Sequence, residues 1–265
     1  MRRVIFNQKG GVGKSTITCN LAAINAHHGR STLVVDLDPQ SNSSHYILGH
    51  TLLDPQVTMH GLYDNILAYN HLNKQQLQKF IHLSPFENLS VLPACGDLEL
   101  LHTKLESRHK IYKLRDILKQ LGEVYDDIYI DTPPALNFFS RSALIAADRC
   151  LIPFDCDEFS RRALLTLKEN LIEIQQDHHP DLSVEGIIVN QFQSQAKLPK
   201  VLVNSLEETE LPLIGPYLSS SIKVRESHQA AQPLIYFAPK HKLTEEFLAI
   251  YAALYENVES VVMVE

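Results

Sequence analysis

The chain has 265 residues, of which 45% are hydrophobic and 21% charged, and these proportions are ordinary for a globular protein with a substantial core. Its 31 acidic and 24 basic residues give a formal net charge of −7, which argues mildly against a dedicated nucleic-acid binder but leaves a local basic patch open. No apolar run approaches the ~20 residues that span a bilayer, and no secretory signal precedes the first strand pattern, so we expect a cytoplasmic protein.

Apolar runs typical of buried strands alternate with helical patterns along the chain. We expect strands at 3–6, 32–36, 89–92, 127–131, 150–154, 184–190 and 212–215. Helices are expected at 14–28, 97–105, 110–121, 159–177, 198–208 and 242–258. The irregular region 40–88 is expected to hold two or three short helices, with 58–68 and 74–81 among them. The alternation predicts one α/β domain over 1–265, a mostly parallel twisted sheet with helices on both faces.

The segment 7-NQKGGVGKST-16 follows the first expected strand and opens the first expected helix, which is the setting of a phosphate-binding loop. Glycines allow backbone N–H groups to approach phosphate oxygens, and the helix N-terminus adds a partial positive charge. In such a loop the lysine neutralises the β- and γ-phosphates and the next hydroxyl can ligate Mg²⁺. The nucleotide-binding candidates are Gly10, Gly11, Val12, Gly13, Lys14, Ser15 and Thr16.

Aspartates end two of the expected strands. Asp36 and Asp38 flank Leu37, so strand alternation places both carboxylates on one side and Leu37 on the other. Asp131 closes the run 128–130 and is followed by two prolines that stiffen the next loop. Ligand sites of open α/β sheets lie at the carboxyl ends of the strands, so we expect these aspartates at the phosphate site.

The loop departs from the general phosphate-binding pattern, because Gln8 replaces a glycine and Lys9 precedes the glycines. With 34-VVDLDPQ-40, 128-IYIDTPP-134 and 187-IIVNQF-192, it resembles the deviant Walker A P-loop ATPases of the ParA/MinD family over nearly the full length. The resemblance is weakest at 45–85. It implies a P-loop NTPase fold, ATP and Mg²⁺ as cofactors, and a weak ATPase activity that a partner protein stimulates.

The resemblance also implies roles for individual residues. Lys9 would reach the nucleotide of the partner subunit in an ATP-sandwich homodimer, with Lys14 and Asp38 completing the catalytic set. Ser15, Asp36 and Asp131 would serve the magnesium ion. Asn190 would contact the adenine edge, and a turn-forming asparagine is the alternative interpretation.

Three branches of the family make different demands on the remaining sequence. The tail 256-ENVESVVMVE-265 is acidic and lacks the basic face of a membrane-anchoring helix, which argues against the MinD branch. A second branch binds a metal cluster through paired cysteines. The cysteines here lack the loops of that branch, and we interpret Cys19, Cys95, Cys150 and Cys156 as reduced thiols, with Cys95 as a small buried residue.

The partition branch binds DNA non-specifically through basic side chains. The candidates here are Lys223, Arg225, Arg161, Arg162, Lys197 and Lys200, although Ser220 stands where relatives often carry arginine.

These patterns favour a ParA-type ATPase whose ATP-bound dimer binds non-specific DNA. With a ParB-like or other activator protein it would segregate or position a chromosome, a plasmid or a protein assembly, and it would then associate with the nucleoid. The chain starts at its first strand, so no operator-reading helix-turn-helix domain is expected. Two alternatives stay open, a positioning switch that acts through protein partners without DNA binding and a metabolic P-loop ATPase.

Overall fold

The computed structural model describes residues 1–50, 53–68, 72–155, 160–193, 195, 206 and 211–262, and the side chains of 160–162 and 256–262 are not described. Within these residues eight strands form one sheet in the order β3-β4-β2-β5-β1-β6-β7-β8. The strands are β1 (Arg2–Ile5), β2 (Thr32–Asp36), β3 (His82–Leu83), β4 (Leu89–Leu92), β5 (Asp127–Asp131), β6 (Arg149–Asp155), β7 (Ser183–Asn190) and β8 (Leu213–Ile214).

The sheet is the mostly parallel sheet that the sequence predicts. Every adjacent pair of strands is parallel except β3 and β4, which are antiparallel at the edge. All seven expected strands are present; three have the expected boundaries, and the other four differ from them by one residue at one or both ends. The additional strand β3 has only two residues, too few for an alternating pattern to reveal it.

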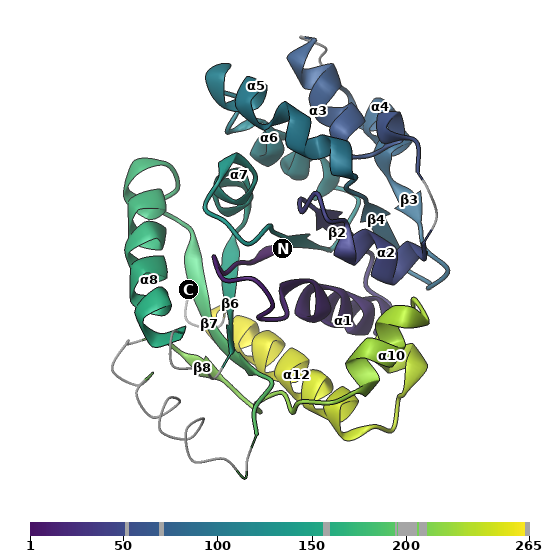
Figure 1. Cartoon of the computed structure of the whole chain (residues 1–265), viewed down its shortest axis with the longest axis vertical. Coiled ribbons are helices and arrows are strands. Elements are labelled where there is room, and N and C mark those ends of the chain that lie inside the picture. The colour runs from purple at the N-terminus through teal and green to yellow at the C-terminus, as the bar shows by residue number, and fades with distance from the viewer. Residues whose placement is uncertain are drawn as a thin grey trace.

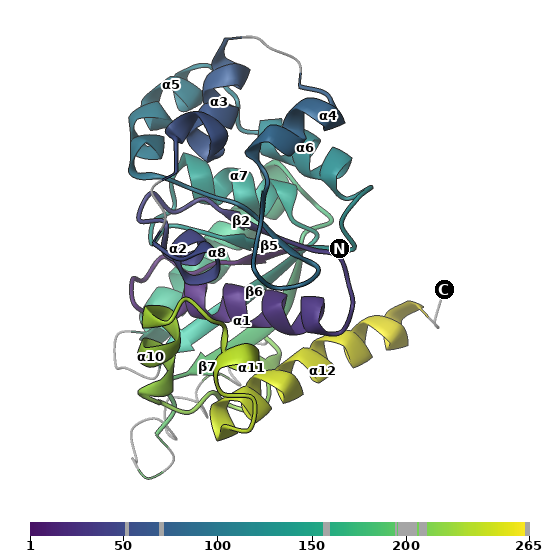
Figure 2. The same ribbon diagram turned by 90° about the vertical axis from the view of Figure 1, so that its right-hand side faces the viewer.

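The α-helices cover both faces of the sheet (Figures 1 and 2). They are α1 (Lys14–His27), α2 (Asn42–Leu48), α3 (Met59–Leu67), α4 (Lys74–Leu77), α5 (His102–Ser107), α6 (Lys113–Leu121), α7 (Phe138–Ala146), α8 (Ser160–Asp177), α10 (Lys223–Gln229), α11 (Leu234–Phe237) and α12 (Lys242–Val262). Short 3₁₀ turns occur at Pro55–Val57, Gln78–Phe80 and Gly96–Leu101.

Several helix predictions need correction. The helix expected at 97–105 is a 3₁₀ turn followed by α5, and the helix expected at 110–121 begins only at Lys113. The sequence analysis does not predict α7, α10 or α11, and the expected helix at 198–208 lies almost entirely outside the described residues. Helical periodicity does not reveal α7, because this helix is buried on nearly all sides and so lacks a polar stripe. Its capping box, Asn137 with Ser140, was the available signal.

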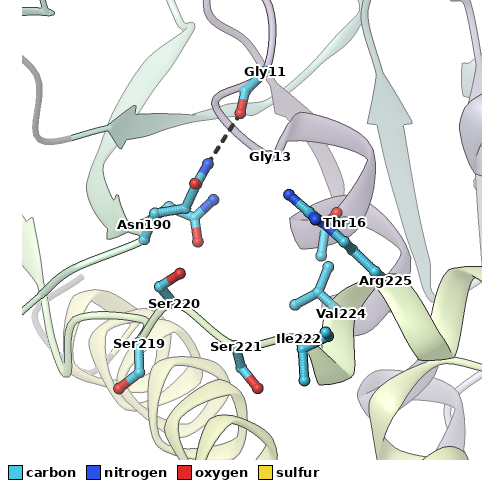
Figure 3. Close-up of a pocket in the computed structure, with 11 residues that line it drawn as sticks. Gly11, Gly13, Thr16, Asn190, Ser219, Ser220, Ser221, Ile222, Val224 and Arg225 are labelled. Atoms are coloured by element: carbon cyan, nitrogen blue, oxygen red, sulfur yellow. Dashed lines mark hydrogen bonds between the residues drawn. The ribbon is translucent and has the colours of Figure 1, made fainter.

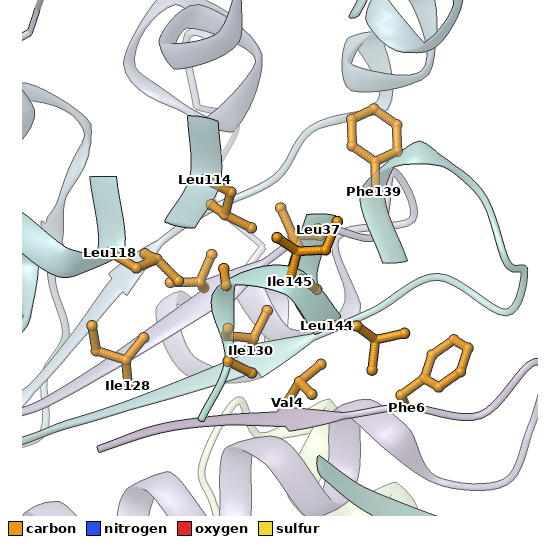
Figure 4. Close-up of a cluster of buried hydrophobic side chains, with 14 of the residues drawn as sticks. Val4, Phe6, Leu37, Leu114, Leu118, Ile128, Ile130, Phe139, Leu144 and Ile145 are labelled. Atoms are coloured by element: carbon orange, nitrogen blue, oxygen red, sulfur yellow. The ribbon is translucent and has the colours of Figure 1, made fainter. Parts of the chain in front are cut away.

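Two hydrophobic cores lie on opposite faces of the sheet, because alternate residues of each strand point to opposite sides. Val4 and Phe6 of the β1 segment belong to the core under α3, α5, α6, α7 and α8, whereas Ile5 belongs to the core under α1, α2 and α12. Figure 4 shows the first core, where Leu144 and Ile145 of α7 lie against the strands. Burial of apolar side chains on both faces holds the strands in register.

A buried ion pair joins β1 to β7 within the sheet. The β6–β7 register shifts between Cys150 and Leu151, which leaves Glu185 as the extra residue of a bulge. Glu185 accepts hydrogen bonds from Arg3 Nε at 2.6 Å and from a terminal guanidinium nitrogen at 2.8 Å. The two side chains are only 1% and 4% exposed. The two opposite charges are therefore paired inside the fold. Removing either side chain would leave the other charge buried and unpaired.

Candidate functional site

The phosphate-binding loop connects β1 to α1 at the carboxyl edge of the sheet. Gly11 and Gly13 adopt positive φ values of 76° and 92°, a region that glycine enters without a steric penalty. A Cβ at Gly13 would lie 2.2 Å from Asn190 Nδ2, so this position has neither the conformation nor the space for a side chain. Gly13 is also the N-cap of α1 and provides no side-chain cap. The first N–H groups of α1 are therefore available to an anion.

Lys14, the first residue of α1, is buried and lies among acidic side chains. Its Nζ donates to the Lys9 carbonyl oxygen at 2.8 Å. Burial lowers the pKa of Lys14, while the nearby carboxylates of Asp131 and Asp38 act in the opposite direction. The ammonium group thus sits in a partly desolvated position, where its attraction to an incoming phosphate is stronger than in water.

The strand order brings the three predicted motifs together. Strand β5 lies between β1 and β2, so the loop after β1 and the carboxyl ends of β2 and β5 are neighbours. Asp36 and Asp131 are register partners in the β2–β5 pair, and both are fully buried. Asp38 is also buried, and Leu37 between them belongs to the core. The alternation inferred for 36–38 is therefore confirmed.

The oxygens of Asp36 and Asp131 accept hydrogen bonds from Ser44 and Ser43, two residues that the sequence analysis does not assign to the site. Asp36 accepts from the Ser44 hydroxyl at 2.7 Å and from the Asp38 amide at 3.0 Å. Asp131 accepts from the Ser43 hydroxyl at 2.7 Å and also from the Ser15 hydroxyl. Ser43 and Ser44 lie in α2, which was not expected as an element of this site. The serine-rich run 41–44 directly after the β2 motif was the only hint.

Burial raises the pKa of both carboxyl groups, and the proximity of Asp131 raises that of Asp36 further. For Asp131, hydrogen bonds from Ser15 and Ser43 act in the opposite direction. Three buried carboxyl groups, those of Asp36, Asp38 and Asp131, lie beside a single buried lysine, and a divalent cation there would favour their ionised forms and offset their negative charge. Carboxylate and hydroxyl oxygens are the ligands that Mg²⁺ prefers, so this donor set fits a magnesium ion.

A pocket of about 530 Å³ opens beside the loop (Figure 3). The floor comes from the loop and α1, and the walls come from the end of β7 and the segment 219–225. Its lining residues are Gly11, Gly13, Thr16, Asn190, Gln191, Ser219, Ser220, Ser221, Ile222, Val224 and Arg225. Asn190 donates its amide to the Val12 carbonyl at 2.9 Å, and Gln191 donates to the Gly11 carbonyl at 3.2 Å. The end of β7 is thus fastened to the loop, and Asn190 lines the pocket beside it.

Lys9 contacts a carboxylate of its own chain. Its Nζ lies 3.8 Å from Asp155 Oδ2 at the end of β6, and its backbone N–H donates to Asn7 Oδ1 at 2.9 Å. The two side chains are 28% and 27% exposed. An ion pair of this length and exposure contributes at most about 1 kcal/mol, so Lys9 can exchange this contact for another at little cost.

Of the predicted DNA contacts, only Lys223 and Arg225 have side chains within the described residues. Lys223 and Arg225 both lie in α10, where Lys223 pairs with Glu226 at 2.6 Å and Arg225 lines the pocket. Ser220 lines the same pocket. The side chains of Arg161 and Arg162, and all of Lys197 and Lys200, lie outside the described residues.

Two further sequence interpretations concern cysteines and membranes. Cys19 and Cys150 are buried thiols, whereas Cys95 is partly exposed and accepts a hydrogen bond from Thr58 at 3.3 Å, so its reading as a buried residue is wrong. Cys156 and the side chains of the acidic tail lie outside the described residues. Among the helices that the structure describes, none has the length and apolar character needed to cross a membrane.

Comparisons with known proteins agree with this geometry. The model of the family described as "AAA domain" matches residues 3–184. The chain is 34% identical over 252 residues to "Chromosome partitioning protein ParA" of Myxococcus xanthus, covering 93% of this chain and 84% of that protein. It is 32% identical over 206 residues to "Chromosome-partitioning ATPase Soj" of Treponema pallidum, covering 77% of this chain and 76% of that protein.

The fold also matches a solved structure. Cobyrinic acid a,c-diamide synthase of Mycobacterium smegmatis with bound ADP and magnesium superposes with a TM-score of 0.82 at 24% identity, covering 98% of this chain and 95% of that one. At this level of identity the likeness concerns the fold alone. The family match, the two relatives and the motif geometry agree, and the chain belongs to the ParA/MinD family of P-loop ATPases.

Proposed function

We propose that this protein is a ParA-type ATPase that binds Mg-ATP in the described site and dimerises when it does so. The observation that carries the proposal is the convergence of the glycine loop, Lys14 and the two buried carboxylates at the ends of three adjacent strands. The similarity to the named partition proteins supports this interpretation.

The loop would hold the nucleotide through its backbone. The open N–H groups of residues 10–16 would bind the phosphate oxygens, and Lys14 would neutralise the β- and γ-phosphates. Asn190 and the segment 219–221 would border the base and ribose in the adjoining pocket. Because the base needs the Asn190 amide, its bond to Val12 would be exchanged on binding.

Ser15 and Asp131 would hold the magnesium ion, which when bound offsets the charge of the phosphates and the carboxylates. Both oxygens of Asp36 accept hydrogen bonds from protein groups, so its role would be to position Asp38 and Ser44 and to add negative charge beside the metal. Asp38 would orient the attacking water, since its backbone is fixed by Asp36.

Lys9 would act across the dimer interface. Its contact with Asp155 is weak enough to break, and a lysine at the γ-phosphate of the partner's nucleotide would act as an arginine finger does, by stabilising transition-state charge. Dimerisation would thereby depend on the nucleotide. A partner protein would accelerate hydrolysis and return the chain to its monomeric state.

Non-specific DNA binding by the ATP-bound dimer is the proposed output, with chromosome, plasmid or protein assembly as cargo. Lys223 is the best placed candidate because it lies on the exterior of α10 next to the nucleotide pocket. One observation favours the alternative of a positioning switch without DNA binding: Lys223 is already paired with Glu226 in a chain of net charge −7.

DNA co-sedimentation with Mg-ATP, with ADP, and with Asp38→Ala plus ATP, across a salt series, tests the proposal. We expect binding that requires ATP, persists in Asp38→Ala, weakens steeply with salt and is lost in Lys223→Ala. Size-exclusion chromatography with light scattering on the same samples reports the dimer. ATP-dependent dimerisation without DNA retention at low salt would support the positioning switch. The absence of both dimerisation and DNA binding would refute the proposed function.

A further inference from the structure

We propose that Arg225 is a nucleotide-binding residue, which contacts the phosphate end of the bound nucleotide from the wall opposite the glycine loop. The inference rests on the proposed function, and it assigns to the nucleotide a residue that the sequence alone offered as a DNA contact. Figure 3 shows the Arg225 side chain extending from α10 into the pocket, with its guanidinium directed toward the loop at Gly13.

The charge distribution of the pocket supports this assignment. Arg225 is the one charged side chain among the described lining residues, and no acidic group lines the same pocket. Within the part of the chain that the structure describes, the Arg225 guanidinium has no ion pair or hydrogen bond, and the neighbouring Glu226 is engaged by Lys223 at 2.6 Å. An unpaired guanidinium beside the uncapped N-terminus of α1 forms an electropositive opening that suits an anion.

The packing of α10 determines where Arg225 points. His228, three residues later and therefore on the same helix face, lies with Nε2 3.0 Å from the Thr16 hydroxyl. Its ring stacks on Tyr46 at 3.7 Å, and the Tyr46 hydroxyl lies 2.8 Å from Ser227 Oγ. These contacts fasten α10 to the first turn of α1 and to α2, so Arg225 is held on the side of α10 that faces the loop.

Lys223 occupies a different position on the same short helix. It pairs with Glu226, its Nζ lies 5.7 Å from the Phe237 ring centre, and it is absent from the pocket lining. Arg225 and Lys223 therefore have different surroundings: Arg225 lines the nucleotide pocket, whereas Lys223 lies outside it and is paired with Glu226. The competing interpretation is that Arg225 is an ordinary exposed charge or a DNA contact, which would leave nucleotide affinity unchanged when it is removed.

The test is a calorimetric titration of ATP and ADP, with Mg²⁺, into the full chain and into Arg225→Ala, Arg225→Lys and Lys240→Ala. The last variant removes one exposed cation outside the pocket and is the matched control. We expect Arg225→Ala to weaken both nucleotides about tenfold, with a smaller salt dependence of the affinity, because a charge-assisted contact to phosphate is lost. Arg225→Lys should recover part of this loss, and Lys240→Ala should stay within about twofold of the parent.

The outcomes separate this inference from the proposed function. If the parent chain binds ATP and Arg225→Ala binds it equally well, the inference is refuted while the proposed function stands. Equal losses in Arg225→Ala and Lys240→Ala would also refute it, since they would reflect net charge rather than a contact. If the parent binds neither nucleotide, both are refuted. Thermal unfolding without nucleotide should be unchanged in Arg225→Ala because the side chain is exposed, and it verifies that the variant folds.

Discussion

Replacing Gly13 by alanine should destabilise the nucleotide-free protein, partly because the added side chain would displace Asn190. The positive φ of 92° costs an alanine about 1–2 kcal/mol relative to glycine. The added Cβ would also lie 2.2 Å from Asn190 Nδ2, so the asparagine must move and give up its bond to Val12, a further loss of about 1 kcal/mol. We therefore expect Gly13→Ala to lower the free energy of unfolding by about 2–3 kcal/mol.

Gly29 offers a matched control at the end of α1. Its φ of 83° imposes a similar conformational cost, but an added Cβ would meet no atom within 4 Å. Gly29→Ala should cost only about 1–2 kcal/mol. In the double variant Gly13→Ala/Asn190→Ala the clash disappears and the bond to Val12 is lost only once. We expect this variant to be about 1 kcal/mol more stable than additivity of the two single changes would predict.

Urea unfolding of the nucleotide-free variants, followed by circular dichroism, measures these differences at equal m-values. The reasoning fails if Gly13→Ala is no more destabilising than Gly29→Ala, or if the changes at positions 13 and 190 are strictly additive. Either result would mean that Asn190 is not held against the loop in solution. In a parallel titration, Gly13→Ala should also weaken ATP binding, because the displaced asparagine and the distorted loop both belong to the pocket.

Further predictions concern groups around the site and the sheet. Glu185→Gln leaves the Arg3 guanidinium buried without its counter-ion and should lower the free energy of unfolding in urea by about 3–5 kcal/mol. The double variant Arg3→Met/Glu185→Leu should regain most of this stability, and equal losses in the two variants would contradict the buried pair. Asp155→Asn weakens one in-chain contact of Lys9 and should favour the ATP-bound dimer a few-fold in light scattering. Unchanged or weaker dimerisation would count against the exchange of contacts. Burial lowers the pKa of His228 from 6.5 to about 4, so its contribution to stability is fully present above pH 6.5 and is lost as pH falls toward 4. His228→Gln should flatten the dependence of the unfolding midpoint on pH over this range, and an unaltered slope would contradict the neutral buried ring.

The existence and the bounds of the core strands followed closely from sequence pattern. Runs such as 32–36 and 127–131 are apolar throughout because parallel strands are buried on both faces, and periodicity identifies them well. Helix α7 was missed for the same physical reason, since a helix buried on all sides has no polar stripe. Cys95 was misjudged because a small residue after a strand can be buried or exposed, depending on what packs over it.

By itself the sequence determined the glycine loop, its lysines, the aspartates at the strand ends and the family, because each depends on residue types at fixed local spacing. Tertiary structure alone decided which distant residues complete the site. The placement of β5 between β1 and β2 made Asp36 and Asp131 register partners, and α2 brought Ser43 and Ser44 to their oxygens. The packing of α10 against α1 and α2 turned Arg225 toward the nucleotide pocket. Such contacts join residues far apart in the chain, and the face that a short helix presents is set by what it packs against rather than by its own sequence.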